Sequence, residues 1–221
     1  TYAIAPLTIV DRMYRKRDGF RVNYEKFMEI LNELSEKDDI CIIKDDKMIW
    51  KAVLQDNLYE KIEEFQGDRD FYIPTVEEIL DYAKHGYPSQ DVSYRKLASF
   101  LRDELHISEE KIEELLYIVY KEFSMDGMLS DIMEEFKKRD IVFDSDRQME
   151  RFAPIMMEVN NNTRMLDFRG YTPNEVSRAE QAAAPAPVAP AMPSFVPMAN
   201  TPAVNMKPKK KVYPNDPCPC G

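Results

Sequence analysis

The stretch DVSYRKLASFLRDELHISEEKIEELLYIVYKEF, residues 91–123, contains two consecutive amphipathic helices. Apolar residues recur in it at spacings of three and four, which is the period of one helix face. Asp91 and Ser108 precede the two sets of regularly spaced apolar residues and are expected to cap the helices. Two capped helices joined by a short link predict a helical core. The core residues expected are Tyr94, Leu97, Phe100 and Leu101 in the first helix and Ile112, Leu115, Leu116, Val119 and Phe123 in the second.

Similar patterns extend to both sides of this stretch. Thr75 with Glu78, and Thr172 with Glu175, have the spacing of capping boxes that begin helices. Pro154 lies inside a third pattern, capped by Ser145 or Asp146, and should kink that helix or mark its start. Further helices are expected over 23–37, 57–66 and 128–138, and an extended piece over 141–143.

A short β-hairpin is expected between the first two of these helices. Residues 40–43 and 48–50 are apolar, and they flank the polar run 44–47, which suits a tight turn. The predicted fold class is therefore mainly α: a helical body over 1–180 with a small hairpin. A helix followed by a hairpin at 23–54 is also similar to part of a winged-helix unit.

The composition changes after Glu180. Residues 181–212 contain eight Ala and seven Pro, with no Gly and no acidic residue. Repeated Pro prevents helix formation and favours extended polyproline II. This segment is expected to be an unfolded, semi-rigid linker.

Charge is divided unevenly along the chain, whose net charge is −10. Residues 181–221 contain four Lys and a single acidic residue, Asp216. Residues 1–180 contain 26 basic and 39 acidic side chains. An acidic body should repel a phosphate backbone. The lysines Lys209, Lys210 and Lys211 are the better candidates for contacting RNA, a ribosome or an anionic lipid surface, unless they only solubilise the linker.

The common enzyme signatures are missing from the sequence. It contains no GxGxxG, GxxxxGK[ST], HExxH or GxSxG pattern, and its paired glutamates fall in helices, where they form solvated faces. Cys41 is expected to be an apolar strand residue, and His85 and His106 are expected to be structural. Three cysteines and no long apolar run favour a cytoplasmic protein without a membrane span.

One sharp motif stands at the end of the sequence, where residues 215–221 read NDPCPCG. This run resembles the opening of the SEC-C motif, the small zinc-binding module found at the C-terminus of the SecA translocation ATPase and in other bacterial proteins. The resemblance implies that residues 213–221 are the first half of such a module. It implies that Cys218 and Cys220 are zinc ligands.

Two thiolates do not close a tetrahedral zinc site, which needs four ligands. In the family, a second ligand pair follows downstream, and here the sequence stops at Gly221. Zinc is therefore expected in a longer parent protein and is not expected to bind stably to this 221-residue form.

A second stretch also carries a resemblance. Residues 160–164 and 170–175 are similar to a segment that precedes the linker in SEC-C-bearing proteins of Gram-positive bacteria, a likeness that implies no activity. One interpretation is structural: the asparagines end a helix and Gly170 turns the chain. The other is a polar recognition surface formed by Asn161, Asn162 and Arg164.

The sequence favours a non-enzymatic adaptor, in which the body binds one partner and the tail binds another. The SEC-C resemblance implies that a chaperone, a translocation component or the ribosome is a partner. The alternative is a nucleic-acid-associated regulator that uses the helix-hairpin unit at 23–54 and the Lys-rich tail.

Overall fold

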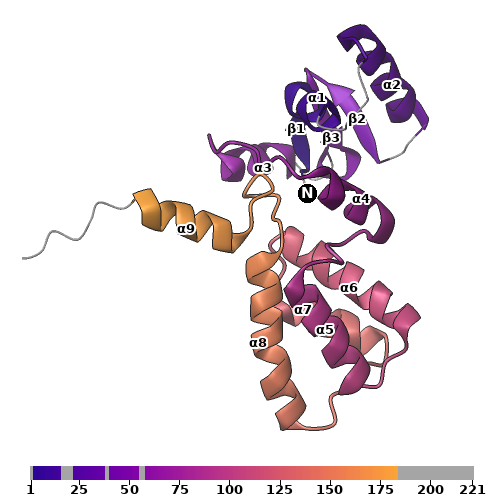
Figure 1. The fold of residues 1–221 in the computed structure, drawn as a ribbon, viewed down its shortest axis with the longest axis vertical. Coiled ribbons are helices and arrows are strands. Elements are labelled where there is room, and N and C mark those ends of the chain that lie inside the picture. Colours follow the sequence, from indigo (N-terminus) through magenta and orange to yellow (C-terminus); the bar gives the residue numbers. More distant parts are fainter. Residues whose placement is uncertain (1, 16–21, 38–39, 55–57, 184–221) are drawn as a thin grey trace, which may run out of the picture. The chain divides into compact units, whose positions relative to one another are not determined.

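The computed structural model describes residues 2–15, 22–37, 40–54 and 58–183. Helices dominate this part of the chain, as predicted, and a small sheet accompanies them (Figure 1). Contacts group residues 1–184 into one compact unit, separate from 185–221. The predicted linker over 181–212 lies, from residue 184 onward, outside the described residues, as does all of the predicted tail motif.

The elements are β1 (Ile4–Pro6), α1 (Leu7–Arg15), α2 (Tyr24–Lys37), β2 (Cys41–Lys44), β3 (Lys47–Trp50), a 3-10 helix η1 (Lys51–Leu54), α3 (Leu58–Gln66), α4 (Val76–His85), α5 (Val92–Asp103), α6 (Glu109–Ser124), α7 (Leu129–Lys138), α8 (Asp146–Asn162) and α9 (Pro173–Ala183).

The sheet contains the predicted hairpin and one strand that the sequence did not reveal. Strands β2 and β3 pair antiparallel across Asp45 and Asp46, which both have positive φ, as tight hairpin turns require. Strand β1 pairs with the other edge of β3, with Ile4 opposite Ile49. The backbone N–H of Leu7 then donates to the carbonyl of Asp46 at 2.8 Å, which ties the start of α1 to the hairpin turn.

The main core lies among α5, α6, α7 and α8, and it confirms the predicted helix faces. Every apolar residue named above for residues 91–123 is at most 5% exposed. Phe136 from α7 and Phe152 from α8 join them, with their ring centroids 5.9 Å apart. Burial of each such side chain favours folding by roughly 1.5–3 kcal/mol.

A smaller core lies beside the sheet and is joined to α6 by the segment that follows α8. Ile4 and Ile49 pack with Leu166 from that segment. The N–H of Leu166 donates to the carbonyl of Ser124 at 2.9 Å, and Gln66 donates from its side chain to the carbonyl of Leu166 at 3.0 Å. Leu166 therefore connects the end of α6, the end of α3 and the sheet core.

Most of the predicted helix starts are confirmed by their hydrogen bonds. Thr75 and Glu78 form a capping box, Asp91 accepts from the N–H of Ser93, and Ser145 accepts from the N–H of Gln148. Ser108 occupies the predicted N-cap position of α6 with extended backbone angles, although its side chain makes no capping hydrogen bond.

Three further details complete the comparison with the sequence prediction. Helix α8 begins at Asp146, directly after the predicted cap Ser145, and continues through Pro154, so of the two alternatives the proline does not mark its start. Residues 141–143 form no strand; Ile141 and Phe143 pack against the helical core instead. Helix α9 runs to Ala183, three residues beyond the predicted boundary at Glu180, because Ala favours helix until Pro185 opposes it.

Candidate functional site

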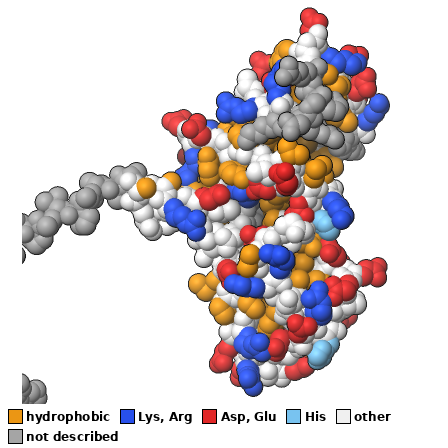
Figure 2. Space-filling model, viewed as in Figure 1, with side chains coloured by type: hydrophobic (Ala, Val, Ile, Leu, Met, Phe, Trp, Pro, Cys, Tyr) orange, Lys and Arg blue, Asp and Glu red, His pale blue; other side chains and the backbone are white. Residues whose placement is uncertain are grey.

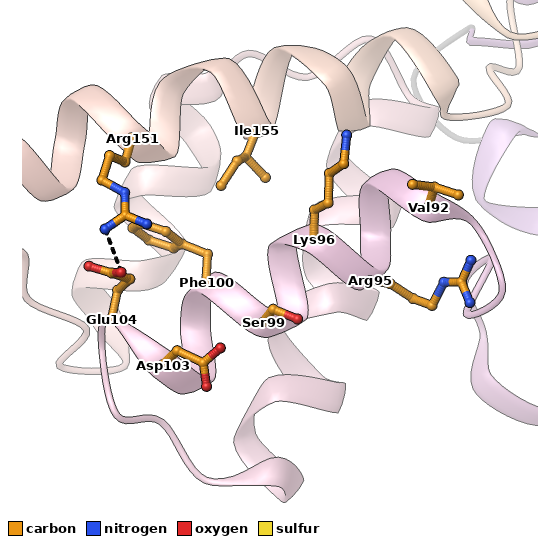
Figure 3. A pocket seen from close by; sticks show the side chains of 9 residues that line it. All are labelled: Val92, Arg95, Lys96, Ser99, Phe100, Asp103, Glu104, Arg151 and Ile155. Atoms are coloured by element: carbon orange, nitrogen blue, oxygen red, sulfur yellow. Dashed lines mark hydrogen bonds and ion pairs between the residues drawn. The ribbon is translucent and has the colours of Figure 1, made fainter.

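A groove of about 460 Å³ runs between α5 and α8. Phe100 and Ile155 point into the space between the two helices, and Val92 lies at the α5 N-terminal end of the groove (Figure 3). Phe100 is 5% exposed and belongs to the main core, whereas Val92 is 54% exposed. The floor is therefore rigid core, and a large apolar side chain is available at one end.

Two ion pairs cross the groove and hold its walls together. Lys96 of α5 donates to both carboxylate oxygens of Glu158 of α8, at 2.6 and 2.8 Å. At the other end, Arg151 of α8 pairs with Glu104, the C-cap residue of α5 (Figure 3). These four side chains are therefore already paired with each other across the groove.

Two charged residues on the rim differ from these because they make no ion pair with any other described residue. Arg95 and Asp103 both line the groove and stand on α5 eight residues apart, with Ser99 midway between them. That spacing corresponds to about 12 Å along one helix face. The rim thus offers one cation and one anion at a fixed separation beside an apolar floor. Figure 2 shows this face with basic and acidic side chains interspersed.

Arg164, which the sequence assigned either to a structural turn or to a recognition surface, is buried. It is 9% exposed, and its guanidinium donates to Glu78 at 2.7 Å, to Glu175 at 3.0 Å and to the carbonyl of Gly170 at 3.1 Å. Glu78 and Glu175 are the carboxylates of the capping boxes that begin α4 and α9. Arg164 therefore joins two helix starts inside the body.

The charges of this cluster stabilise one another. Burial alone would raise the pKa of Glu78, but hydrogen bonds from Thr75, Arg164 and Tyr72 outweigh it and hold that pKa below its usual range. Burial would likewise lower the pKa of Arg164, and the hydrogen bond to Glu78 and the charge of Glu175 outweigh it, so the pKa is raised. Burial and the hydrogen bond to Glu78 raise the pKa of Tyr72 to about 12.

The two asparagines of the same predicted surface occupy the end of α8. Asn162 donates to the carbonyl of Glu158 at 2.8 Å, and its own oxygen accepts from Asn174 at 3.1 Å, which links α8 to α9. Of the three residues, only Asn161 is exposed. The contacts of Asn162 and Arg164 fit the structural interpretation of this segment.

The remaining predicted site residues lie outside the described residues: Cys218, Cys220, Lys209, Lys210 and Lys211. Within the described ranges, no group of three or more His, Cys, Asp and Glu side chains lies together as metal ligands would. His85 faces Glu113, with the Nδ1 to Oε2 distance 3.5 Å. No helix of the described part is long and apolar enough to span a membrane.

The helix-hairpin unit at 23–54 has charges that do not suit a phosphate backbone. Helix α2, the helix that precedes the hairpin, carries four Glu and two Lys in 14 residues. Its exposed apolar side chains, Tyr24 and Leu34, are 53% and 55% exposed. An acidic helix with apolar side chains on its surface favours a protein contact over a nucleic-acid contact.

No protein-family model matches the chain, and no curated protein and no solved structure is significantly similar to it.

Sequence reasoning missed the α5–α8 groove. The regular spacing of Arg95, Ser99 and Asp103 along one helix was visible in the sequence. The packing of α8 against α5 was not, because it is a contact between segments about 60 residues apart in the chain. Without that pairing, Arg95 and Asp103 look like any solvated helix face.

Proposed function

We propose that this chain is a non-enzymatic adaptor, whose body binds a segment of one protein partner in the α5–α8 groove while its tail contacts a second partner. The observation that carries the proposal is the pair Arg95 and Asp103, which make no ion pair with another described residue and flank an apolar floor. Grooves of this kind accept amphipathic segments, with apolar anchors below and charges at the rim.

The charges of the rim define the partner segment by complementarity. It carries a carboxylate to face Arg95 and a cation to face Asp103, about 12 Å apart if both residues of α5 are matched along the helix. An apolar side chain between them reaches Phe100 and Ile155. Rim charges of this kind act mostly on the rate of association and on specificity.

The tail half of the proposal rests on the SEC-C resemblance of residues 215–221 and on the lysines at 209–211. That resemblance favours an export chaperone or the ribosome as the second partner and zinc as the metal of the complete motif. A reducing cytoplasm would keep Cys218 and Cys220 as thiols, ready to bind metal.

Photo-crosslinking from the groove tests the body half of the proposal. A photoreactive amino acid in place of Ser99, which stands between the two unpaired charges, should yield a discrete crosslinked protein in cells. The double charge reversal Arg95→Glu with Asp103→Lys should abolish that product. A matched reversal outside the groove, Lys26→Glu with Glu29→Lys on α2, should leave it unchanged. A product that survives the groove reversal would contradict this use of the groove.

A further inference from the structure

A second cavity, of about 270 Å³, lies between the hairpin and α6 and shares no residue with the α5–α8 groove. Its walls are largely aromatic. Tyr2 and Trp50 come from the sheet region, and Tyr117 and Tyr120 come from α6. Small-molecule sites in proteins are lined in this way, with aromatic and apolar side chains and a few polar groups that set orientation.

The aromatic walls are held by contacts outside the cavity. Tyr117 packs against Gly86, where an added Cβ would lie 2.8 Å from the ring atom Cδ2. The ring of Tyr120 lies 5.3 Å from that of Tyr82, centroid to centroid. Tyr117 and Tyr120 therefore have packing partners that do not depend on a ligand, which lowers the free energy that a ligand would lose in ordering them.

The polar groups of the lining define the charge of the ligand. Lys121 lies in the lining with its side chain 54% exposed, and the nearest ion-pair partner, Glu122, is 4.0 Å from it. Ser124 is 7% exposed and donates its hydroxyl hydrogen to the carbonyl of Lys121 at 2.9 Å, which leaves its oxygen able to accept. None of the described residues that line this cavity is an Asp or a Glu. Among the described lining residues, the charge that a ligand would meet is therefore the cation of Lys121.

We propose that this cavity binds a small planar aromatic carboxylate, with its ring among Tyr117, Tyr120 and Trp50 and its carboxylate at Lys121. The volume is at the lower limit for ligand sites, which suits one aromatic ring rather than a fused polycyclic molecule. The site is separate from the groove of the adaptor proposal, and either one can hold without the other.

Fluorine NMR with three probes of the same shape tests the site. The probes are 4-(trifluoromethyl)benzoate, the corresponding neutral benzyl alcohol and the corresponding benzylamine. The benzoate should show the largest line broadening, and its saturation should parallel a change in the emission of Trp50, the single Trp of the chain and part of the cavity wall. Equal broadening by all three probes, or broadening by the benzoate without a Trp50 response, would overturn the proposal.

Variants separate the ring contacts from the charge contact. Ser124→Phe fills the cavity and should abolish binding of the benzoate. Tyr117→Leu removes one aromatic wall at a half-exposed position and should weaken binding of the benzoate. It serves as the test if Ser124→Phe does not fold. Lys121→Gln should weaken the benzoate about fivefold and leave the alcohol unchanged. Lys96→Gln, the same change in the other groove, should affect neither probe. Unchanged benzoate affinity in Tyr117→Leu and Lys121→Gln would also overturn the site.

Discussion

The guanidinium of Arg164 stacks on the ring of Tyr72, with its central carbon 3.4 Å from the ring centroid. A planar guanidinium can stack in this way and still donate hydrogen bonds from its edge. Arg164 uses that edge to bind Glu78 and Glu175, which begin α4 and α9. Arg164 therefore ties the segment that follows α8 to the starts of α4 and α9.

Removing this charge should destabilise the body strongly. Arg164→Met leaves two half-buried carboxylates without their cation, and we predict a loss of about 2–4 kcal/mol in the free energy of unfolding. Arg164→Lys should fall between Met and the wild type, because Lys keeps the charge but cannot stack or bind in two directions. Urea denaturation of the purified proteins measures both.

The matched control is Arg102→Met, which breaks the exposed pair between Arg102 and Glu109. Solvent screens that pair, so its loss should leave the unfolding curve almost unchanged. Equal effects from the Arg164 and Arg102 variants would show that the buried cluster has no special role.

Acid should weaken the body through Glu78. Because the pKa of Glu78 is lowered on folding, the unfolded chain takes up its proton more readily than the folded one. The contribution to stability is therefore complete above the ordinary pKa of 4.5 and is lost as the pH falls through the lowered folded value. Glu78→Gln retains a capping-box side chain but has no charge.

We predict that Glu78→Gln is less stable than the wild type at neutral pH and that the difference shrinks at about pH 3. Thermal unfolding followed by circular dichroism across this range measures it. Glu77→Gln, the exposed neighbour in the same helical turn, should track the wild type throughout. A constant difference between Glu78→Gln and the wild type at all pH values would contradict the linkage.

Gly86 should tolerate substitution worse than Gly67, although both have positive φ. At Gly86, with φ 79°, a Cβ would also overlap the ring of Tyr117, whereas at Gly67, with φ 56°, no atom lies within 4 Å of the added Cβ. Gly67→Ala should cost about 1 kcal/mol from backbone strain alone. Gly86→Ala should cost at least 1 kcal/mol more, and thermal melts of the two variants compare them directly. Equal costs would show that the Tyr117 contact relaxes freely.

The helices were predictable because their signals are local. The two capping boxes, the left-handed Gly86 and the apolar stripes of α5 and α6 each lie within one or two turns of sequence. A sequence window of that length includes the capping residues of a helix start, the glycine of a helix end and the apolar spacing of a buried face.

The missed elements depend on distant partners. Strand β1 has only three residues, one of them Pro, and it is a strand because β3 supplies its hydrogen bonds from more than 40 residues away. The sequence left the role of Arg164 open between structure and recognition for the same reason: Glu78, its half-buried partner, is 86 residues distant. The sequence contained both capping boxes but did not indicate that one arginine joins them.

Zinc content tests the tail without reference to the fold. Cys218 and Cys220 provide two thiolates, so the 221-residue chain should retain well under one zinc after dialysis. A chain extended with the downstream ligand pair of the SEC-C motif should retain about one. In that extended chain, Cys218→Ser with Cys220→Ser should remove the metal, and Cys41→Ser should not.

Melting of the extended chain should be the same with and without its zinc if, as we propose, the ligands belong to a tail module that the linker decouples from the helical core. Metal analysis by atomic emission, paired with calorimetry, gives both values. Stoichiometric zinc in the 221-residue chain would show that the body supplies ligands and that the tail is not a separate module.

Crosslinking from both ends of one chain tests the adaptor proposal most directly. Photoreactive residues are placed at Ser99 in the groove and at Tyr213 in the tail, singly, and the products are identified by mass spectrometry. The account predicts two different proteins: the Ser99 product is lost only with Arg95→Glu and Asp103→Lys, and the Tyr213 product is lost only when Lys209, Lys210 and Lys211 become Gln. A single protein captured at both positions, or loss of both products with either set of substitutions, would contradict it.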